Sequence, residues 1–390
     1  QNWSEAMDPA FMEVYPNVNV SFTPLGWGDY LQKLQTSMAS GLEIPDIICA
    51  EVGWRMRVYE MDICENLEVA PYNIDRNDMF EYLWPRCEDP DGNIVGLEMA
   101  LCPAGLGYRK DIAQDVFGVS EQKDMEKLFK DKGDNYDAYV TIGKEILEKT
   151  GGKTKMFAGL GDVWSIVYAQ NPADLVNEDG SLNISGKIQP GLETAKKFLD
   201  AGIVSTIDQW TPQWEASYAL GEVFCYPFAT WTTEPVQNDR DPDGAGHWAL
   251  MVPPYGCFSW GGTTMSVYKE GKNKESAWEF VRWTNWDLDG ARKAAEYRDY
   301  QLSRISNYDA DPSLATKYSD YYQQDLFKFW AEDAVDSAIS VTPTRYDQVV
   351  GDSVSMALTA LQADNSLTVE QLLETIKTEI KNKEPDIEFK

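Results

Sequence analysis

Residues 27–51, WGDYLQKLQTSMASGLEIPDIICAE, contain a helix pattern followed directly by a strand pattern. Leu31, Leu34 and Met38 recur at the spacing of one helix face, and Gly41 is placed to end that helix. After a turn, the apolar run IPDIICA at 44–50 is typical of a short buried strand. This succession of a helix and a strand predicts an α/β fold.

The alternation of strands and helices continues on both sides of this stretch. Strands are predicted at 18–22, 223–226 and 247–252, with a hairpin over 89–98 and an extended stretch over 258–268. Helices are predicted over 188–199 before Gly202, around Ala277, Phe280 and Val281, and after a capping Thr368. With 390 residues the chain has room for about two domains, and no low-complexity linker separates them. We therefore expect two α/β domains joined by several short crossings.

The charge balance excludes some partners. The chain has 34 basic and 64 acidic side chains and a formal net charge of −30. Nucleic acids and anionic membranes are themselves negative and are bound through Lys and Arg, so neither is an expected partner. The acidic surface is explained either by solubility or by attraction of a cationic ligand.

Hydropathy leaves two locations open. The chain has no run of about 18 apolar residues that would predict a membrane-spanning helix. A basic stretch followed by an apolar one, which is typical of a signal peptide, does not open the chain either. The sequence is therefore that of a cytoplasmic protein or of a mature exported form.

Few residues are available for catalysis or metal binding. His247 is the only histidine and the six cysteines form no CxxC pair, so neither a zinc site nor a histidine-based catalytic site is expected. Phosphate-cradling glycine motifs are absent, and we expect no cofactor. The segment DPDGN at 89–93 has its glycine too early for a calcium loop and is typical of a β-turn. We expect mostly free, buried thiols and a protein that binds rather than converts its ligand.

Tryptophan and tyrosine are abundant, with 14 and 20 residues. Trp278 and Trp283 fall on an apolar helix pattern and are expected in the core. Others stand in polar or glycine-rich surroundings, namely Trp27, Trp210, Trp214, Trp231 and Trp260. A flat ring with one N–H donor suits a partner that has an apolar face and a polar edge, and a pyranose has that shape. These tryptophans therefore indicate a sugar ligand.

Six segments follow one another along almost the whole chain. They are FMEVYPNVNV at 11–20, the stretch 27–51, GNIVGLEMALCPAGLGYRKDI at 92–112, ALGEVFCYPFATW at 219–231, MVPPYGCFSWGGTTMSVYK at 251–269 and YQLSRISNYDADP at 300–312. In this order they resemble the family of extracellular solute-binding proteins that serve sugar ABC importers. Each segment is short and built of common residues, so the resemblance rests on their order.

The resemblance implies a type II periplasmic-binding-protein fold, in which two α/β lobes are joined by three crossings and hinge around the ligand. Lobe one would comprise 1–105 and 263–303, and lobe two 106–262 and 304–390. The resemblance also implies export, a lipid anchor on the outer face of a bacterial membrane and an ABC permease as partner. We expect a monomer. Because family members open with a strand before the first helix, we expect a leader, the anchoring cysteine and part of that strand to precede Gln1.

The expected ligand is an oligosaccharide whose rings stack on aromatic faces while fixed polar groups bind its hydroxyls. Trp231 and Trp260 match aromatic positions of the family and are the principal candidates. Gly261 and Gly262 would let the backbone approach the ligand closely, or would simply provide hinge conformations. Trp260, Gly261 and Gly262 lie in the segment of the expected second crossing, 251–269, and Trp231 ends the segment before it.

Further candidates lie where strands and loops would meet the ligand. Glu51 ends the strand predicted at 44–50 and would accept hydrogen bonds from two hydroxyls, or would cap a helix. The remaining candidates are Trp27 and Asp29 at the start of the second helix, Asp162 and Trp164 in a loop, and Tyr297 and Arg304 near the third crossing.

Three other functions are compatible with these residues. A cationic ligand such as a polyamine could be held by Glu51 and Asp29 between aromatic rings, and its binding would weaken steeply with salt. A secreted glycoside hydrolase would need a pair of carboxylates, which nothing singles out among the 64 acidic residues; it would release product from oligosaccharides. A scaffold or adhesin would not become more compact when a ligand is added.

Overall fold

Two units, each with its own sheet and core, make up the structure, which is a computed structural model that describes residues 2–26 and 28–390. Unit 1 contains the residues up to Leu101, Gly261–Thr316 and Thr342–Arg345. Unit 2 contains Cys102–Trp260, Lys317–Val341 and Tyr346–Lys390. The division into lobes expected from the sequence, 1–105 with 263–303 and 106–262 with 304–390, stays a prediction. Both units combine helices with a sheet, which confirms the predicted α/β class.

Unit 1 is built on a three-stranded antiparallel sheet with β7 (Thr263–Val267) in the middle. On one side lies β1 (Ile47–Glu51), which confirms the strand predicted around 44–50, and on the other lies β2 (Leu97–Glu98). The helices of this unit are α1 (Asn2–Val14), α2 (Tyr30–Ser40), α3 (Arg55–Tyr59), α4 (Trp84–Cys87), α12 (Lys274–Asn285), α13 (Leu288–Arg298) and α14 (Ser306–Ala310).

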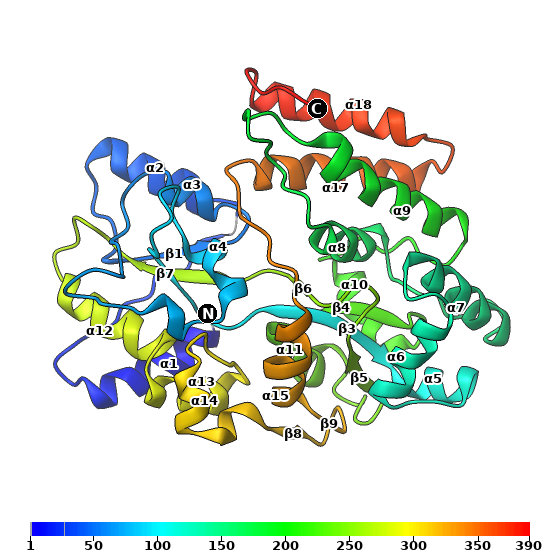
Figure 1. Cartoon of the computed structure of the whole chain (residues 1–390), viewed down its shortest axis with the longest axis horizontal. Coiled ribbons are helices and arrows are strands. Elements are labelled where there is room, and N and C mark those ends of the chain that lie inside the picture. The colour runs from blue at the N-terminus through cyan, green and yellow to red at the C-terminus, as the bar shows by residue number, and fades with distance from the viewer. Residues whose placement is uncertain (1, 27) are drawn as a thin grey trace. The chain divides into compact units, whose positions relative to one another are not determined.

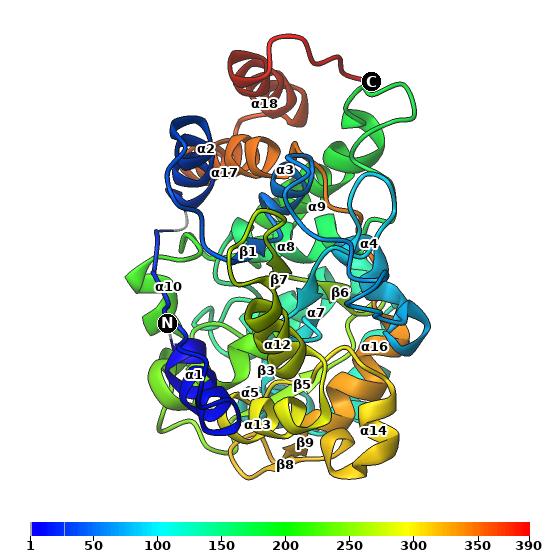
Figure 2. The ribbon, with the colours of Figure 1, turned by 90° about the vertical axis from the view of Figure 1, so that its left-hand side faces the viewer.

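Helices α1, α12 and α13 pack together in unit 1 (Figures 1 and 2). The ring of Phe11 on α1 meets those of Phe280 and Trp283 on α12, with centroids 5.0 and 5.8 Å apart. Trp278 and Trp283 are buried, as the apolar pattern of this helix predicts. Helix α2 also follows its prediction, because it buries Leu31 and Leu34 and ends at a left-handed Gly41.

The strand predicted at 18–22 is wrong. Helix α1 ends at Val14, the N–H of Val18 donates to the carbonyl of Tyr15 in a turn, and the chain from there to residue 26 is irregular. Among the described residues no strand pairs with this segment. Since a strand is stabilised mainly by its neighbours, the alternating apolar residues alone do not form one, and Phe22 is 49% exposed.

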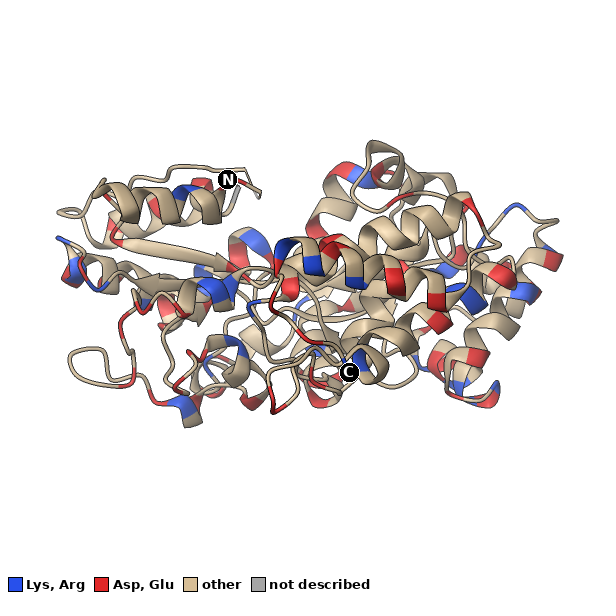
Figure 3. Cartoon of the chain, turned by 90° about the horizontal axis from the view of Figure 1, so that it is seen from above, with Lys and Arg blue, Asp and Glu red and all other residues tan. Residues whose placement is uncertain are grey.

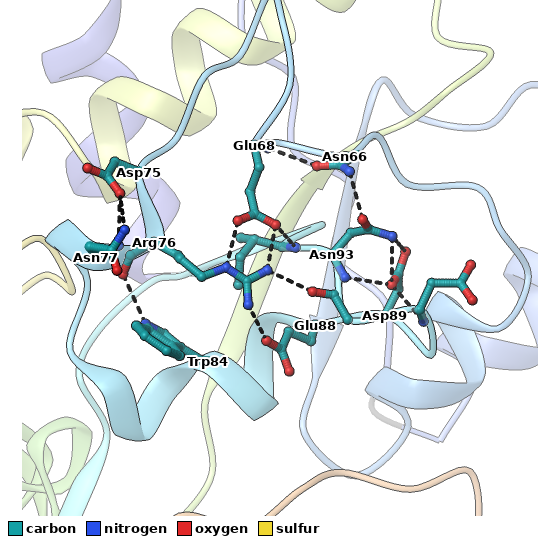
Figure 4. Close-up of polar contacts among 12 residues, drawn as sticks. Asn66, Glu68, Asp75, Arg76, Asn77, Trp84, Glu88, Asp89 and Asn93 are labelled. Carbon is teal, nitrogen blue, oxygen red and sulfur yellow. Dashed lines mark hydrogen bonds and ion pairs between the residues drawn. The ribbon is translucent and has the colours of Figure 1, made fainter.

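Hydrogen bonds of Arg76 fasten the hairpin of unit 1 (Figure 4). Its guanidinium donates to Glu68 at 2.6 Å, to Glu88 at 2.7 Å and to the carbonyl of Gly92 at 2.7 Å. The N–H of Gly92 donates to the carbonyl of Asp89 at 3.0 Å, and Gly92 has φ +80°. The predicted turn is therefore confirmed, and glycine is needed there because other residues rarely adopt this φ.

Unit 2 is built on a four-stranded sheet whose central strand is β3 (Pro103–Arg109). Antiparallel to it lie β4 (Cys225–Ala229), β5 (Trp248–Met251) and the short β6 (Phe258–Ser259). The strands predicted at 223–226 and 247–252 are thus confirmed within one to three residues, and the extended stretch 258–268 divides into β6 and β7. A side chain at Gly107 would meet the ring of Phe228 at 2.3 Å, so this sheet packs too closely for any residue but glycine there.

Helices cover the sheet of unit 2, and α9, α17 and α18 lie side by side (Figure 1). The helices are α5 (Lys110–Phe117), α6 (Gln122–Asp131), α7 (Tyr136–Lys149), α8 (Leu160–Gln170), α9 (Gln189–Asp200), α10 (Pro212–Leu220), α11 (Thr233–Pro235), α15 (Leu326–Lys328), α16 (Val335–Ser337), α17 (Asp347–Ala363) and α18 (Val369–Lys383). A two-stranded ribbon, β8 (Tyr318–Ser319) and β9 (Gln324–Asp325), completes the unit. Helices α9 and α18 confirm two predictions, and α18 begins with the predicted capping box of Thr368 and Gln371.

Candidate ligand-binding site

Four tryptophans of unit 2, Trp210, Trp214, Trp231 and Trp260, form a contiguous group that we call the tryptophan cluster. Trp210 is at its centre, with its ring centroid 5.1 Å from that of Trp214, 6.0 Å from Trp231 and 5.6 Å from Trp260. The Trp210 side chain is 55% exposed, whereas Trp214 is fully buried. The cluster therefore presents one large exposed aromatic ring supported by three others.

Short local elements place the rings of this cluster. Trp210 has φ +67° immediately before α10, and the hydroxyl of Thr211 caps that helix by accepting from the N–H of Trp214 at 3.2 Å. Trp231 lies in the turn that follows β4, and its indole N–H donates to the carbonyl of Trp260 at 3.0 Å. A left-handed conformation costs a residue other than glycine about 1–3 kcal/mol, so the surrounding contacts must hold Trp210 in place.

Asp162 supports this cluster from the interior. It is fully buried on α8, and it accepts from the indole N–H of Trp214 at 3.0 Å and from the side-chain amide of Gln209 at 3.0 Å. Burial raises the pKa of Asp162 to about 7, although these hydrogen bonds act in the opposite direction. The loop predicted for Asp162 and Trp164 is wrong, because both lie in α8, and a ligand on the surface does not reach Asp162.

Trp164 does not join the cluster. Its ring stacks on Tyr168 one turn later, with centroids 4.9 Å apart, and it fits against Gly191 of α9. A side chain at Gly191 would approach the Trp164 ring to 2.6 Å, so this contact is tight. Trp164 thus contributes to the packing of α8 against α9, and only part of its ring is exposed.

In unit 1, Glu51 and Gly262 lie next to each other. Glu51 ends β1, as predicted, and its register partner on β7 is Thr263. The Glu51 carboxylate accepts from the N–H of Gly53 at 2.7 Å, and the N–H of Val52 donates to the carbonyl of Gly262 at 3.0 Å. The carboxylate is partly exposed and closes a turn in the described structure.

Buried charges hold the two glycines that follow Trp260. Gly261 and Gly262 have φ +70° and +110°, and their carbonyls accept from Arg86 at 2.6 Å and from Arg55 at 2.9 Å. Both guanidiniums also donate to one oxygen of Glu98, at 2.9 and 2.6 Å. The conformation of this glycine pair, with its positive φ angles, is therefore fixed by an ion-pair network in the core of unit 1.

The other candidates of unit 1 lie apart from these glycines. Asp29 precedes α2 and is exposed, and its side chain makes no capping hydrogen bond to that helix. Tyr297 on α13 is 44% exposed and lies beside Lys293. Arg304 donates to Asp78 at 2.7 Å, and its guanidinium lies over the ring of Trp286. Trp27 lies outside the described residues.

The structure thus brings Trp231 together with Trp260, and Glu51 together with Gly262. It adds Trp210, which the sequence did not propose as a site residue. The signal was its polar surroundings in DQWTPQWE, which indicate a ring that is not needed in the core. No sequence motif identifies Trp210 as a site residue, because it joins the candidate site only through its contacts with Trp231 and Trp260, which are distant in the chain.

Throughout residues 2–26 and 28–390, His, Cys, Asp and Glu form no group of three or more that could hold a metal ion. Every helix in this part of the chain is too short or too polar to span a lipid bilayer. Cys49, Cys64, Cys87, Cys225 and Cys257 are free thiols, and burial raises their pKa values.

Residues 6–324 match the family model of bacterial extracellular solute-binding proteins, and the chain belongs to this family. A protein of Brucella abortus (strain 2308) that is named as a binding protein is 24% identical over 293 residues, which cover 71% of this chain and 67% of that protein. The family assigned from the six ordered segments is therefore confirmed.

Solved structures confirm the predicted periplasmic-binding-protein fold. The GacH receptor of Streptomyces glaucescens, solved unliganded and with acarbose, has a TM-score of 0.75 at 17% identity and covers 99% of this chain and 95% of its own. The ABC transporter associated binding protein from B. animalis subsp. lactis, solved with β-1,6-galactobiose, has a TM-score of 0.74 at 17% identity and covers 100% and 97%. The three crossings between lobes stay a prediction.

Proposed function

We propose that this chain is the extracytoplasmic capture subunit of an ABC importer and that it binds an oligosaccharide on the tryptophan cluster. The observation that carries this proposal is the exposed ring of Trp210, which is supported by Trp231 and Trp260. An indole of this kind matches the apolar face of a pyranose, and ring N–H groups match its hydroxyls. The sugars bound by the GacH receptor and by the B. animalis protein support this class of ligand.

The proposed roles divide between stacking and hydrogen bonding. Trp210 and Trp260 would stack on sugar rings, and Glu51 with the backbone of Gly261 and Gly262 would bind hydroxyls. We propose that units 1 and 2 are the two lobes expected from the sequence. A micromolar affinity corresponds to about −8 kcal/mol, and net hydrogen bonds supply only about 0.5–1.5 kcal/mol each. Ring stacking would therefore provide much of the affinity.

The proposal also covers the location of the protein and its partners. Family membership supports export and delivery of the ligand to an ABC permease. Anchoring by a lipid, a monomeric state and the absence of nucleic-acid binding and of catalysis are parts of the proposal that rest on the family and on the charge of −30. Incubation with oligosaccharides, followed by analysis of the products, tests whether the chain is a hydrolase instead.

A thermal-shift screen tests the proposed ligand class. We expect at least one oligosaccharide from a panel that includes acarbose and β-1,6-galactobiose to raise the melting temperature. A ligand at a thousand times its dissociation constant stabilises the folded state by about 4 kcal/mol. The shift should be indifferent to salt, because a neutral sugar is not screened. A shift produced by spermidine alone, and lost in salt, would favour the cationic ligand and contradict the proposal.

A further inference from the structure

Two neighbours of the exposed Trp210, Gln209 and Trp214, donate hydrogen bonds to the same buried carboxylate. Gln209, which precedes Trp210 in the chain, donates its side-chain amide to Asp162 at 3.0 Å. Trp214, whose ring meets that of Trp210 at 5.1 Å, donates its indole N–H to the two oxygens of Asp162 at 3.0 and 3.3 Å. Backbone hydrogen bonds with Gly159 and the residue before it complete the shell. Asp162 has no exposed surface, so it acts only through these groups.

We propose that Asp162 is a positioning residue for ligand binding, whose carboxylate holds Gln209 and Trp214 and through them fixes the exposed ring of Trp210. The inference rests on the proposed role of Trp210 as a stacking platform. It deepens that role by making the order of the platform depend on pH.

The shell around Asp162 suits a carboxylate and not a carboxylic acid. The groups of Trp214 and Gln209 that face it are N–H donors, and an ionised carboxylate accepts from all of them. A protonated carboxyl carries a hydrogen of its own and needs an acceptor. Gln209 can supply one by turning its amide over, so that its N–H₂ faces the Ser165 hydroxyl, which also donates to the carbonyl of Gly161. This turn replaces a charge-assisted hydrogen bond to Asp162 by a weaker neutral one and disturbs the residue directly before Trp210. Protonation of Asp162 therefore loosens the platform.

Burial places this protonation near neutral pH, because it raises the pKa of Asp162 to about 7. The buried tyrosines and the cysteine around it do not change charge there. Burial raises the pKa of Tyr218 on α10 and of Tyr226 and Cys225 on β4 well above their ordinary values, so these groups stay neutral. Arg240, whose guanidinium lies over the Trp214 ring at 5.0 Å, is paired with Glu215.

Stability and platform order follow this titration in opposite directions. Because the folded-state pKa lies above the ordinary value of 3.8, folding favours the protonated form. The contribution of Asp162 to stability is therefore complete below that ordinary value and is lost as pH rises through about 7. The order of Trp210 follows the charged form and increases over the upper part of this range. If Asp162 had a purely structural role, stability would fall with rising pH but the order of Trp210 would not change.

Acrylamide quenching of tryptophan fluorescence measures the order of Trp210 without any ligand. The difference between the wild-type chain and the Trp210→Phe variant isolates this ring. We expect the quenching of Trp210 to be roughly twofold stronger below the pKa of Asp162 than above it, with a midpoint near 7. The Asp162→Asn variant places an amide N–H₂ toward the N–H donors of Gln209 and Trp214, with which it cannot pair. In this variant the quenching of Trp210 should be strong and independent of pH. Thermal melting of each variant checks that it is folded.

Asp241→Asn is the matched control. Asp241 is also buried in unit 2 and accepts from an indole N–H, that of Trp248 at 2.8 Å, but it does not contact Gln209 or Trp214. This variant should keep the wild-type pH profile. A flat profile in the wild-type chain, or the same loss in Asp241→Asn, would overturn the proposal.

A second variant covers the case in which Asp162→Asn does not fold. Gln209→Ala removes the amide that turns over and should flatten the pH profile of Trp210; an unchanged profile would contradict the mechanism. Since acrylamide is the only probe, failure to bind oligosaccharides would refute the proposed function and leave this result standing. Conversely, sugar binding with a flat quenching profile would refute only the role of Asp162.

Discussion

Glu98 is the centre of a buried ion-pair network in unit 1. One of its carboxylate oxygens accepts from Arg55 at 2.6 Å and from Arg86 at 2.9 Å, and all three side chains are at most 2% exposed. The guanidiniums in turn hold the carbonyls of Gly261 and Gly262. The conformation of the glycine pair therefore depends on a carboxylate more than 160 positions away in the chain.

Replacement of Glu98 by Gln should destabilise the protein by about 3–5 kcal/mol, because it leaves two buried guanidiniums without a counter-charge. Urea unfolding measures this change. The control is Glu68→Gln, which removes the carboxylate that pairs with Arg76 at 24% side-chain exposure and should cost only about 1 kcal/mol. Equal losses in the two variants would show that burial of the network has no special role.

Single residues also show what the sequence could and could not predict of the site. Trp231 and Trp260 were predicted because they stand in ordered family segments, and their proximity is a structural finding. Trp210 was missed as a site residue, since exposure of a ring depends on what packs around it. The burial of Asp162 was missed for the same reason, because its partners Gln209 and Trp214 are 47 and 52 residues away.

At the scale of elements, patterns that depend on near neighbours in the chain were predicted correctly. Helix α18 begins where Thr368 and Gln371 exchange hydrogen bonds, at 2.9 and 3.3 Å, and α9 is followed by a left-handed Gly202. The strand expected at 18–22 failed, since a strand needs a partner that only the fold provides. The ends of β4 and β5 in unit 2 differ from the predicted ones by one to three residues for the same reason.

The capping box of α18 gives an element-scale prediction. Thr368→Ala should destabilise the protein by about 1 kcal/mol, because the N–H of Gln371 loses its acceptor. Differential scanning calorimetry measures the effect as a lowered melting temperature. Thr375→Ala, in the exposed interior of the same helix, is the control and should leave stability within about 0.5 kcal/mol. A loss in Thr375→Ala as large as that in Thr368→Ala would contradict the capping role.

For the molecule as a whole, charge and aromatic content point to different properties. Acidic and basic side chains are interspersed over the chain in Figure 3, although the net charge is −30. A negative charge of this size disfavours binding of a polyanion such as a nucleic acid. The proposed binding of sugar rests instead on the tryptophan cluster, whose four residues all belong to unit 2. The fold was predicted from six short segments that follow one another in the order found in the family. Each segment alone is too short and too common to identify a fold, but their shared order is not.

The central claim is that the tryptophan cluster binds sugar, and isothermal titration calorimetry of single variants tests it most directly. With the oligosaccharide that gives the largest thermal shift, Trp210→Ala and Trp260→Ala should each bind at least tenfold more weakly, a loss of about 1.4 kcal/mol. Tyr318→Ala removes an equally exposed aromatic ring of unit 2 outside the cluster and should bind as the wild-type chain does. Unchanged affinity in both tryptophan variants would contradict the account.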